Sequence, residues 1–262
     1  MKYAKKSLGQ NFLKDKNIIK KILNLSKIHN KNIIEIGPGN GELTKEILKK
    51  KPKSLIIIEK DNLLCSGLKL KYSHLQNLQI YNSDILKFNL EVELKNDTVI
   101  FGNLPYNISS QILVKILRLK NWPSNITDII FMFQKELGEK IIGKFSTTNY
   151  GRISILANYR LRVLNKFYVS RNCFFPKPKV TSIVIHFKPR KDLFKIRYIS
   201  NLEKVTNILF SNKRKMINKN LRKLLKKNTI IKHPEINLRL RPSDVDELTF
   251  YKITELFEKD HS

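Results

Sequence analysis

Residues 33–41 have the sequence IIEIGPGNG, which joins a short apolar run to a turn that contains three glycines. An apolar run of this kind is typical of a strand that is covered on both faces in a parallel sheet. Glycines let the chain bend sharply and bring its backbone against a ligand. Their G-x-G-x-G spacing differs from the G-x-G-x-x-G pattern that seats a dinucleotide pyrophosphate. Taken alone, the loop is equally consistent with an ordinary tight turn.

Similar apolar runs recur along the chain and are separated by longer amphipathic stretches. The runs cover residues 33–36, 55–58, 78–81, 99–101 and 129–133. Between the first two, residues 43–50 are typical of a helix, because Leu43, Ile47 and Leu48 fall on one helical face. The alternation predicts a doubly wound α/β sheet. Two later runs, 163–169 and 182–187, have no helix-length insert between them and are predicted to close the sheet as an antiparallel pair.

The pattern breaks at residues 188–192, with the sequence KPRKD. We therefore expect one domain over residues 1–190 and a small, basic, all-helical domain over residues 191–262. In the second domain, residues 213–227 are predicted to form a helix with an apolar and a basic face. The apolar face would carry Ile217, Leu221 and Leu224, and the basic face Lys215, Lys219, Arg222 and Lys226. Ser243 and Asp246 have the spacing of a capping box before a final helix.

The composition indicates a folded protein with an affinity for polyanions. Its 51 basic and 22 acidic residues give a net charge of +29 over 262 residues, which favours nucleic acid as a partner. The two cysteines and five histidines have no metal-ligand spacing, so we expect reduced thiols and no metal site. The apolar runs are too short to cross a bilayer, and the N-terminus lacks the apolar core of a signal peptide. We expect a monomeric cytoplasmic protein without a membrane partner.

Two carboxylates follow the next two runs after the glycine loop. Glu59 ends the second run, where a carboxylate can reach a ribose diol, and Asp84 follows the third, where it can read an adenine amino group. Together with Gly37 and Gly39, these residues predict an adenosine-type cofactor. They do not separate NAD from S-adenosylmethionine, and each carboxylate alone is more typical of a solvated strand end.

The turn after the fourth run, Asn103-Leu104-Pro105-Tyr106, separates the two cofactors. The exocyclic amine of adenine is a poor nucleophile, since its lone pair is delocalised into the ring. The Asn103 side-chain carbonyl and the Leu104 main-chain carbonyl, which Pro105 biases inward, can accept its two hydrogens and aim the lone pair at a methyl sulfonium. Tyr106 offers a face on which an extruded base stacks. This scheme depends on positioning and needs no general base.

With these residues in place, the chain resembles the bacterial small-subunit rRNA adenine N6,N6-dimethyltransferases over nearly its full length. The matching stretches are residues 6–13 (KSLGQNFL), the Gly37 loop, 58–59, Asp84, 102–109 (GNLPYNIS), 134–136 (QKE), 150–152 (YGR) and 174–180 (FFPKPKV). The resemblance implies a Rossmann-like class I methyltransferase domain that uses S-adenosylmethionine and releases S-adenosylhomocysteine. It also implies a substrate of two adjacent adenosines in the 3′-terminal hairpin loop of small-subunit rRNA.

The resemblance also assigns roles to residues outside the strand ends. Asn11 and Leu13 would close over the methionine end of the cofactor, and Phe174 would face the target base opposite Tyr106. A core position for Phe174 is equally consistent with its type, because aromatic residues are usually packing residues. The basic face of residues 213–227 would grip the RNA backbone of the small-subunit precursor.

Three alternatives remain at this level. The related large-subunit rRNA adenine N6-methyltransferases share the glycine loop and the Asn-x-Pro-Tyr turn, but residues 6–9 and 150–152 favour the small-subunit type. A non-catalytic ribosome-assembly factor on the same fold would show erosion of the cofactor loop or of the Asn103 turn, and neither is eroded. A nicotinamide dehydrogenase would leave the Asn103 turn and the charge unexplained.

Overall fold

The computed structural model describes residues 9–123 and 125–261. Its strands are β1 (Phe12–Leu13), β2 (Asn32–Ile36), β3 (Ser54–Glu59), β4 (Leu78–Asn82), β5 (Thr98–Asn103), β6 (Ile126–Gln134), β7 (Leu161–Val169), β8 (Phe174–Phe175) and β9 (Ser182–Pro189). Its α-helices are α1 (Lys16–Leu23), α2 (Glu42–Lys49), α3 (Asn62–Tyr72), α4 (Ser109–Leu117), α5 (Lys135–Ile141), α6 (Arg152–Arg160), α7 (Ile199–Phe210), α8 (Asn218–Leu221), α9 (Lys227–Lys232) and α10 (Glu247–Asp260). Short 3-10 turns are η2 (Leu90–Glu93), η3 (Arg171–Cys173) and η4 (Pro242–Asp244).

Seven strands form one mixed sheet in the order β4-β3-β2-β5-β6-β9-β7. Strands β2 to β6 are parallel to their neighbours, and β9 is antiparallel to β6. The predicted α/β fold is thus confirmed. All five apolar runs are strands, and β9 and β7 are the last two strands at one edge of the sheet, as expected.

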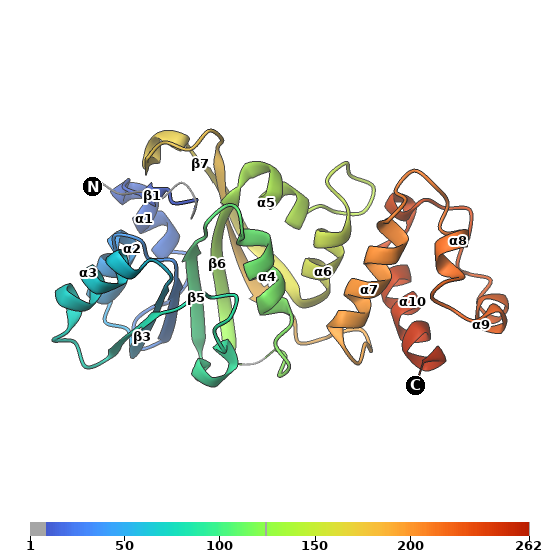
Figure 1. The fold of residues 1–262 in the computed structure, drawn as a ribbon, viewed down its shortest axis with the longest axis horizontal. Helices are drawn as coiled ribbons and strands as arrows, with labels where there is room; N and C mark the ends of the chain where they lie inside the picture. Colours follow the sequence, from blue (N-terminus) through green and yellow to red (C-terminus); the bar gives the residue numbers. More distant parts are fainter. Residues whose placement is uncertain (1–8, 124, 262) are drawn as a thin grey trace. The chain divides into compact units, whose positions relative to one another are not determined.

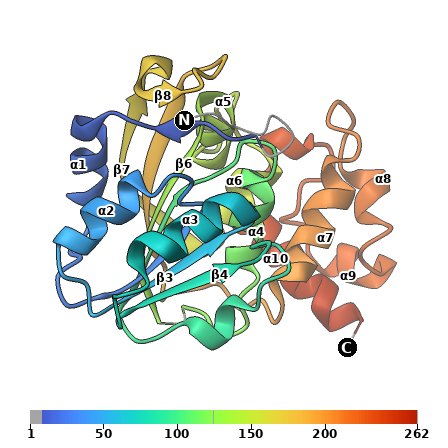
Figure 2. The same cartoon turned by 60° about the vertical axis from the view of Figure 1, so that its left-hand side comes forward.

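The central strands β2, β3 and β5 are buried on both faces, which explains their unbroken apolar runs. Helices α1, α2 and α3 lie on one face and α4 on the opposite face (Figures 1 and 2). Successive side chains of a strand point to opposite faces, so each central strand contributes to two cores. Ile33 and Val99 join the core cluster under α1 and α2, and every residue of β2 is buried.

The strand order reverses between β2 and β5. From β2 the chain adds β3 and β4 on one side, and then returns to add β5 and β6 on the other. In open α/β sheets, ligands bind in the crevice beyond the carboxyl ends of the strands at such a switch point. Here those ends carry the Gly37 loop after β2 and the Asn103 turn at the end of β5, so the topology brings together the two motifs that the sequence separates.

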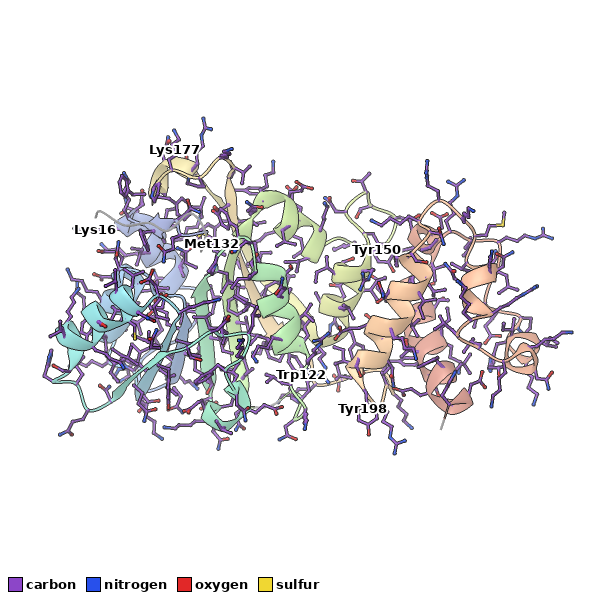
Figure 3. All side chains as sticks on the ribbon, viewed as in Figure 1. Lys16, Trp122, Met132, Tyr150, Lys177 and Tyr198 are labelled. Carbon is purple, nitrogen blue, oxygen red and sulfur yellow. The ribbon has the colours of Figure 1, made fainter. Side chains whose placement is uncertain are left out.

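The chain divides into two compact units. The first contains residues 1–138 and 163–189, and the second contains residues 139–162 and 190–262. One division falls between residues 189 and 190, and residues 139–162, which the sequence analysis places in the first domain, group with the helical unit. Within that unit α7 packs against α6 and α10. Tyr150, labelled in Figure 3, is anchored there because its hydroxyl donates to the Val245 carbonyl at 2.9 Å.

Residues 213–227 do not form the single helix that their periodicity predicts. Within this segment α8 is flanked by turns, and α9 begins at the last residue, Lys227. The Ile217 amide donates to the Leu240 carbonyl, and the Lys226 amide donates to Asp260, so tertiary partners replace the helical ones. The expected sidedness is nevertheless present, since the three apolar residues are buried and the four basic ones are exposed.

The predicted N-cap of the last helix was also wrong, because the helix begins three residues later than the sequence indicated. Asp246, expected as the third helical residue behind a Ser243 cap, is itself the N-cap of α10 and accepts from the Thr249 amide at 3.0 Å. Cys65 and Cys173 are both free thiols. Among the described residues, no helix combines the length and the apolar character that are needed to span a bilayer.

Candidate active site

A pocket lies at the carboxyl ends of β2, β3 and β5 in the first unit. All predicted site residues except Phe174 line it, namely Asn11, Leu13, Gly37, Gly39, Glu59, Asp84, Asn103, Leu104, Pro105 and Tyr106. Ile36 and Gly102 are register partners in the β2–β5 pair, so Gly37 and Asn103 are the next residues of two adjacent strands. A Cβ placed on Gly37 would lie 3.7 Å from Pro105 Cδ. The Asn103 turn therefore faces the glycine loop.

The glycine loop adopts the conformation for which its residue type is required. Gly37 and Gly39 have φ values of +68° and +59°, in the left-handed region that other residues rarely enter. The ring of Phe12 lies directly against Gly39, where an added Cβ would come within 2.7 Å of it. Any side chain at Gly39 would therefore strain the backbone and displace Phe12 from the pocket wall.

Glu59 is 6% exposed and supports the glycine loop from β3. Its two carboxylate oxygens accept from the Gly39 amide at 3.1 Å and from the Asp61 amide at 2.8 Å. Burial raises the pKa of Glu59 even though these amide bonds favour the charged form. Since each carboxylate oxygen accepts more than one hydrogen bond, Glu59 retains capacity for a ligand.

A second buried carboxylate, Glu35, also lines the pocket and was not predicted as a site residue. It is 1% exposed, and Thr44 of α2 donates its hydroxyl to it at 2.6 Å. Burial raises the pKa of Glu35 to about 7, with a smaller contribution from the nearby charge of Glu59. The pocket thus holds two acidic groups in a poorly solvated place, which favours a positively charged ligand group.

Asp84 lies at the pocket rim in contact with Lys60. Lys60 Nζ is 2.8 Å from one carboxylate oxygen, and the Leu86 amide donates to the other at 2.9 Å. The Lys60 bond lowers the pKa of Asp84, so this carboxylate is charged near neutral pH. A ligand amine that donates to Asp84 therefore shares this carboxylate with the ammonium of Lys60.

Asn103 is held by the N-terminal segment of the described chain. Its Nδ2 donates to the Asn11 carbonyl at 3.0 Å. Because a carbonyl accepts only from the NH2 end of the amide, this bond determines which way the side chain is flipped, and it leaves Oδ1 as an acceptor. The Asn11 side chain in turn donates to the Gly9 carbonyl at 3.3 Å. Asn11 therefore orients Asn103 through its main chain.

Tyr106 is anchored at both ends. Its hydroxyl is 2.5 Å from the Ser182 Oγ of β9, and its carbonyl accepts from the Ser109 hydroxyl at 3.2 Å at the start of α4. Burial raises the pKa of Tyr106, which keeps the phenol protonated. Ser182 was not predicted from the sequence.

Phe174, which the family resemblance sets against the target base, is buried in this structure. The side chain is 2% exposed and belongs to the core cluster, because the antiparallel pairing of β1 with β8 sets it opposite Leu13. Its neighbour Phe175 is 44% exposed. Phe174 is thus a core residue under the N-terminal segment, the packing position that the sequence analysis also considered. It does not line the described pocket.

The remaining wall of the pocket is apolar and comes from β6 and β9. Met132, labelled in Figure 3, and Val184 line it from these two strands. Among the described residues, no group of three His, Cys, Asp or Glu side chains is placed to hold a metal ion. Residues 6–8 of the distinguishing motif at 6–9 lie outside the described residues.

The chain is similar to known ribosomal RNA methyltransferases. The family model for ribosomal RNA adenine dimethylase matches residues 1–259. The chain is similar to ribosomal RNA small subunit methyltransferase A of Pelagibacter ubique, with 41% identity over 97% of each chain. A dimethyladenosine transferase from Plasmodium falciparum has a similar structure, with 27% identity, a TM-score of 0.78 and coverage of 95% of this chain and 98% of that one. The 23S rRNA methyltransferase ErmE shares the fold at 21% identity and a TM-score of 0.65, over 94% of this chain and 99% of its own.

Proposed function

The chain belongs to the ribosomal RNA adenine dimethylase family, and on that premise we propose that it methylates small-subunit rRNA. It transfers methyl groups from S-adenosylmethionine to the N6 amines of two adjacent adenosines in the 3′-terminal hairpin loop, giving N6,N6-dimethyladenosine during ribosome biogenesis. One observation carries the proposal. The Asn103 turn faces the glycine loop across one pocket, so a base held by the turn meets a cofactor held by the loop.

The residues around the glycine loop fit S-adenosylmethionine. Gly37 leaves the floor of the pocket open, since a Cβ there would touch nothing closer than 3.7 Å. Glu59 holds the ribose diol and Asp84 reads the adenine amino group, while Asn11 and Leu13 cover the methionine end. The buried acids Glu35 and Glu59 favour the positive charge of the cofactor. When bound, the cofactor supplies a methyl group on a sulfonium, which is a strong electrophile.

The Asn103 turn prepares the nucleophile. Asn103 Oδ1 and the Leu104 carbonyl accept the two N6 hydrogens of the target adenosine, and Pro105 stiffens the turn that presents them. The amine then aims its lone pair away from the ring plane and toward the methyl group. Each transfer replaces one N6 hydrogen with a methyl group, and that hydrogen leaves as a proton. Tyr106 stacks on the extruded base, so positioning supplies most of the rate enhancement.

The second unit supplies RNA affinity in this proposal. The exposed basic residues between positions 213 and 227 bind phosphates of the small-subunit precursor, because a net charge of +29 attracts a polyanion. The proposal takes the protein to act as a monomer in the cytoplasm, where small subunits are assembled.

The decisive experiment is mass spectrometry of rRNA nucleosides from cells with and without this protein. We expect N6,N6-dimethyladenosine in small-subunit rRNA only when the protein is present, at two adjacent positions of the 3′-terminal hairpin loop. Dimethyladenosine in large-subunit rRNA instead would assign the enzyme to the related large-subunit rRNA adenine N6-methyltransferases. If purified protein binds undermethylated small subunits but incorporates no tritiated methyl groups, the protein is a non-catalytic assembly factor.

A further inference from the structure

The ring of Tyr106 requires an anchor at its far end. A base stacks well only on a ring whose position is defined, but a tyrosine ring swings to another position when the torsion about its Cα–Cβ bond changes rotamer. The Ser109 hydroxyl fixes the Tyr106 carbonyl and so holds the main chain, which leaves the side chain free to swing. The phenol oxygen lies on the long axis of the ring, so a contact made by this atom fixes the direction of that axis and resists the swing.

Ser182 makes that contact. Its Oγ lies 2.5 Å from the Tyr106 hydroxyl, and either group can be the donor. Ser182 is 0% exposed and is the first residue of β9, where it pairs with Gln134 at the carboxyl end of β6. Two sheet strands therefore hold the Ser182 hydroxyl rigidly. Ser182 itself does not line the described pocket, so it reaches a ligand only through Tyr106.

We propose that Ser182 is a positioning residue for methyl transfer, whose buried hydroxyl holds the far end of the Tyr106 ring and so sets the position at which the ring meets the target adenine. The inference rests on the proposed function, because it assumes that Tyr106 stacks on the base. It gives β9, which follows all the stretches that carry the family resemblance, an influence on the reacting geometry through Tyr106. Burial that keeps the Tyr106 pKa raised also keeps the phenol neutral, so the hydrogen bond persists over the working pH range.

The test is a double-mutant cycle with Ser182→Ala and Tyr106→Phe. Each substitution removes the hydroxyl–hydroxyl bond and keeps the ring. Steady-state methyl transfer is measured on small subunits that lack dimethyladenosine, with separate values of kcat and of KM for S-adenosylmethionine. Ser154→Ala is the matched control, since Ser154 is also 0% exposed and its hydroxyl donates to the Gly151 carbonyl at 2.8 Å, outside the pocket.

We expect Ser182→Ala and Tyr106→Phe each to lower kcat about five- to tenfold, as the loss of one buried hydrogen bond does, with an unchanged KM for the cofactor. The double variant should be no slower than either single variant, because both remove the same contact. The Ser154→Ala control should retain the wild-type kcat. Thermal unfolding monitored by circular dichroism verifies that each variant is folded at the assay temperature.

Three outcomes would overturn the inference. The first is a wild-type kcat in a folded Ser182→Ala or Tyr106→Phe variant. The second is a double variant whose loss is the product of the single losses, since the two hydroxyls would then act independently. The third is an equal loss of kcat in the Ser154→Ala control, which would reveal a general packing effect. If the wild-type protein transfers no methyl groups, the proposed function itself is refuted. That result differs from all three outcomes above, because each of them requires an active wild-type protein.

Discussion

Asn103 and Glu59 each combine two tasks in one side chain. Asn103 donates its amide to Asn11 and keeps its oxygen for the proposed substrate amine. Glu59 holds the Gly39 amide and keeps acceptor capacity for the proposed ribose. In both residues the bond to the protein fixes the orientation of the atom that faces the ligand. Preorganisation of this kind lowers the cost of ordering the side chain during binding.

Replacing Asn103 with alanine should abolish most methyl transfer and leave binding intact. We expect kcat to fall on the order of a hundredfold or more, because one of two acceptors aimed at the amine is lost. The affinity for S-adenosylmethionine should stay within a few-fold of wild type, as measured by calorimetry. Asn125→Ala is the control, since Asn125 donates to the Leu94 carbonyl outside the pocket. Near-normal turnover by Asn103→Ala would refute the role of its side chain.

Replacing Glu59 with alanine should weaken S-adenosylmethionine binding roughly ten- to hundredfold, the range for hydrogen bonds to a charged group. Titration calorimetry of the purified protein measures this effect without RNA. Asp97→Ala is the control, because Asp97 pairs with Lys31 and lies outside the pocket lining. An unchanged affinity of Glu59→Ala would remove the assignment to the ribose.

Glu35→Gln should make the cofactor-free protein more stable at high pH. Burial raises the pKa of Glu35 from 4.5 to about 7, so the folded state binds this proton more tightly than the unfolded state does. Wild-type stability therefore falls as the pH rises from about 4.5 to 7, by up to about 3 kcal/mol. Glutamine stays neutral and avoids that loss.

Urea unfolding at pH 5 and at pH 8 checks the prediction for Glu35. The advantage of Glu35→Gln over wild type should be larger at pH 8 than at pH 5. Glu46→Gln on α2 is the control, because a hydrogen bond from Lys49 lowers the pKa of Glu46 and no gain at high pH is expected. An equal difference at the two pH values would contradict the burial argument.

At the scale of elements, the structure separates patterns that predict well from patterns that do not. The central strands are predicted correctly because both faces are covered, so almost every residue is apolar. The 213–227 segment has helical periodicity, yet its donors at Ile217 and Lys226 bond to distant acceptors. Periodicity reports which side of a segment is buried, and here it was right. It does not report whether the main chain bonds within the segment.

The N-cap of α10 offers a test at this scale. Asp246→Ala should destabilise the protein by about 1 kcal/mol, because the side chain accepts from the Thr249 amide. Ser243→Ala should be neutral, since Ser243 bonds only its exposed neighbour Asp244 among the contacts described here. Urea unfolding of the two variants measures the difference. A larger loss from Ser243→Ala would restore the capping register predicted from the sequence.

At the scale of the whole molecule, the two units have different proposed tasks. The first unit contains the entire pocket, and the second contains the basic 213–227 segment. A net charge of +29 disfavours a compact chain through self-repulsion, so a charge of this size is consistent with a polyanionic partner. Binding to RNA neutralises that charge and releases counterions.

RNA affinity should therefore fall steeply with salt. On a single-stranded RNA, each lost phosphate contact reduces the slope of log K against log salt by about 0.7, so Lys215→Gln with Lys219→Gln should reduce it by about 1.4. Fluorescence anisotropy with labelled RNA over a salt series measures the slope. Lys69→Gln with Lys71→Gln on α3 removes the same charge, and an equal reduction there would mean that net charge alone, without a local surface, accounts for the binding.

The sequence alone was enough to predict the features that are local patterns within a few residues. These are the strand positions, the glycine loop, the carboxylates Glu59 and Asp84 at strand ends, and the Asn103 turn. The partnership of Ser182 with Tyr106 and the pocket position of Glu35 could not be predicted, and the sequence did not decide between the two positions considered for Phe174. They depend on which strands become neighbours, and Tyr106 and Ser182 meet only because β9 turns back beside β6. Local sequence carries backbone propensity and hydrophobic period, whereas contacts between distant segments exist only after the sheet has closed.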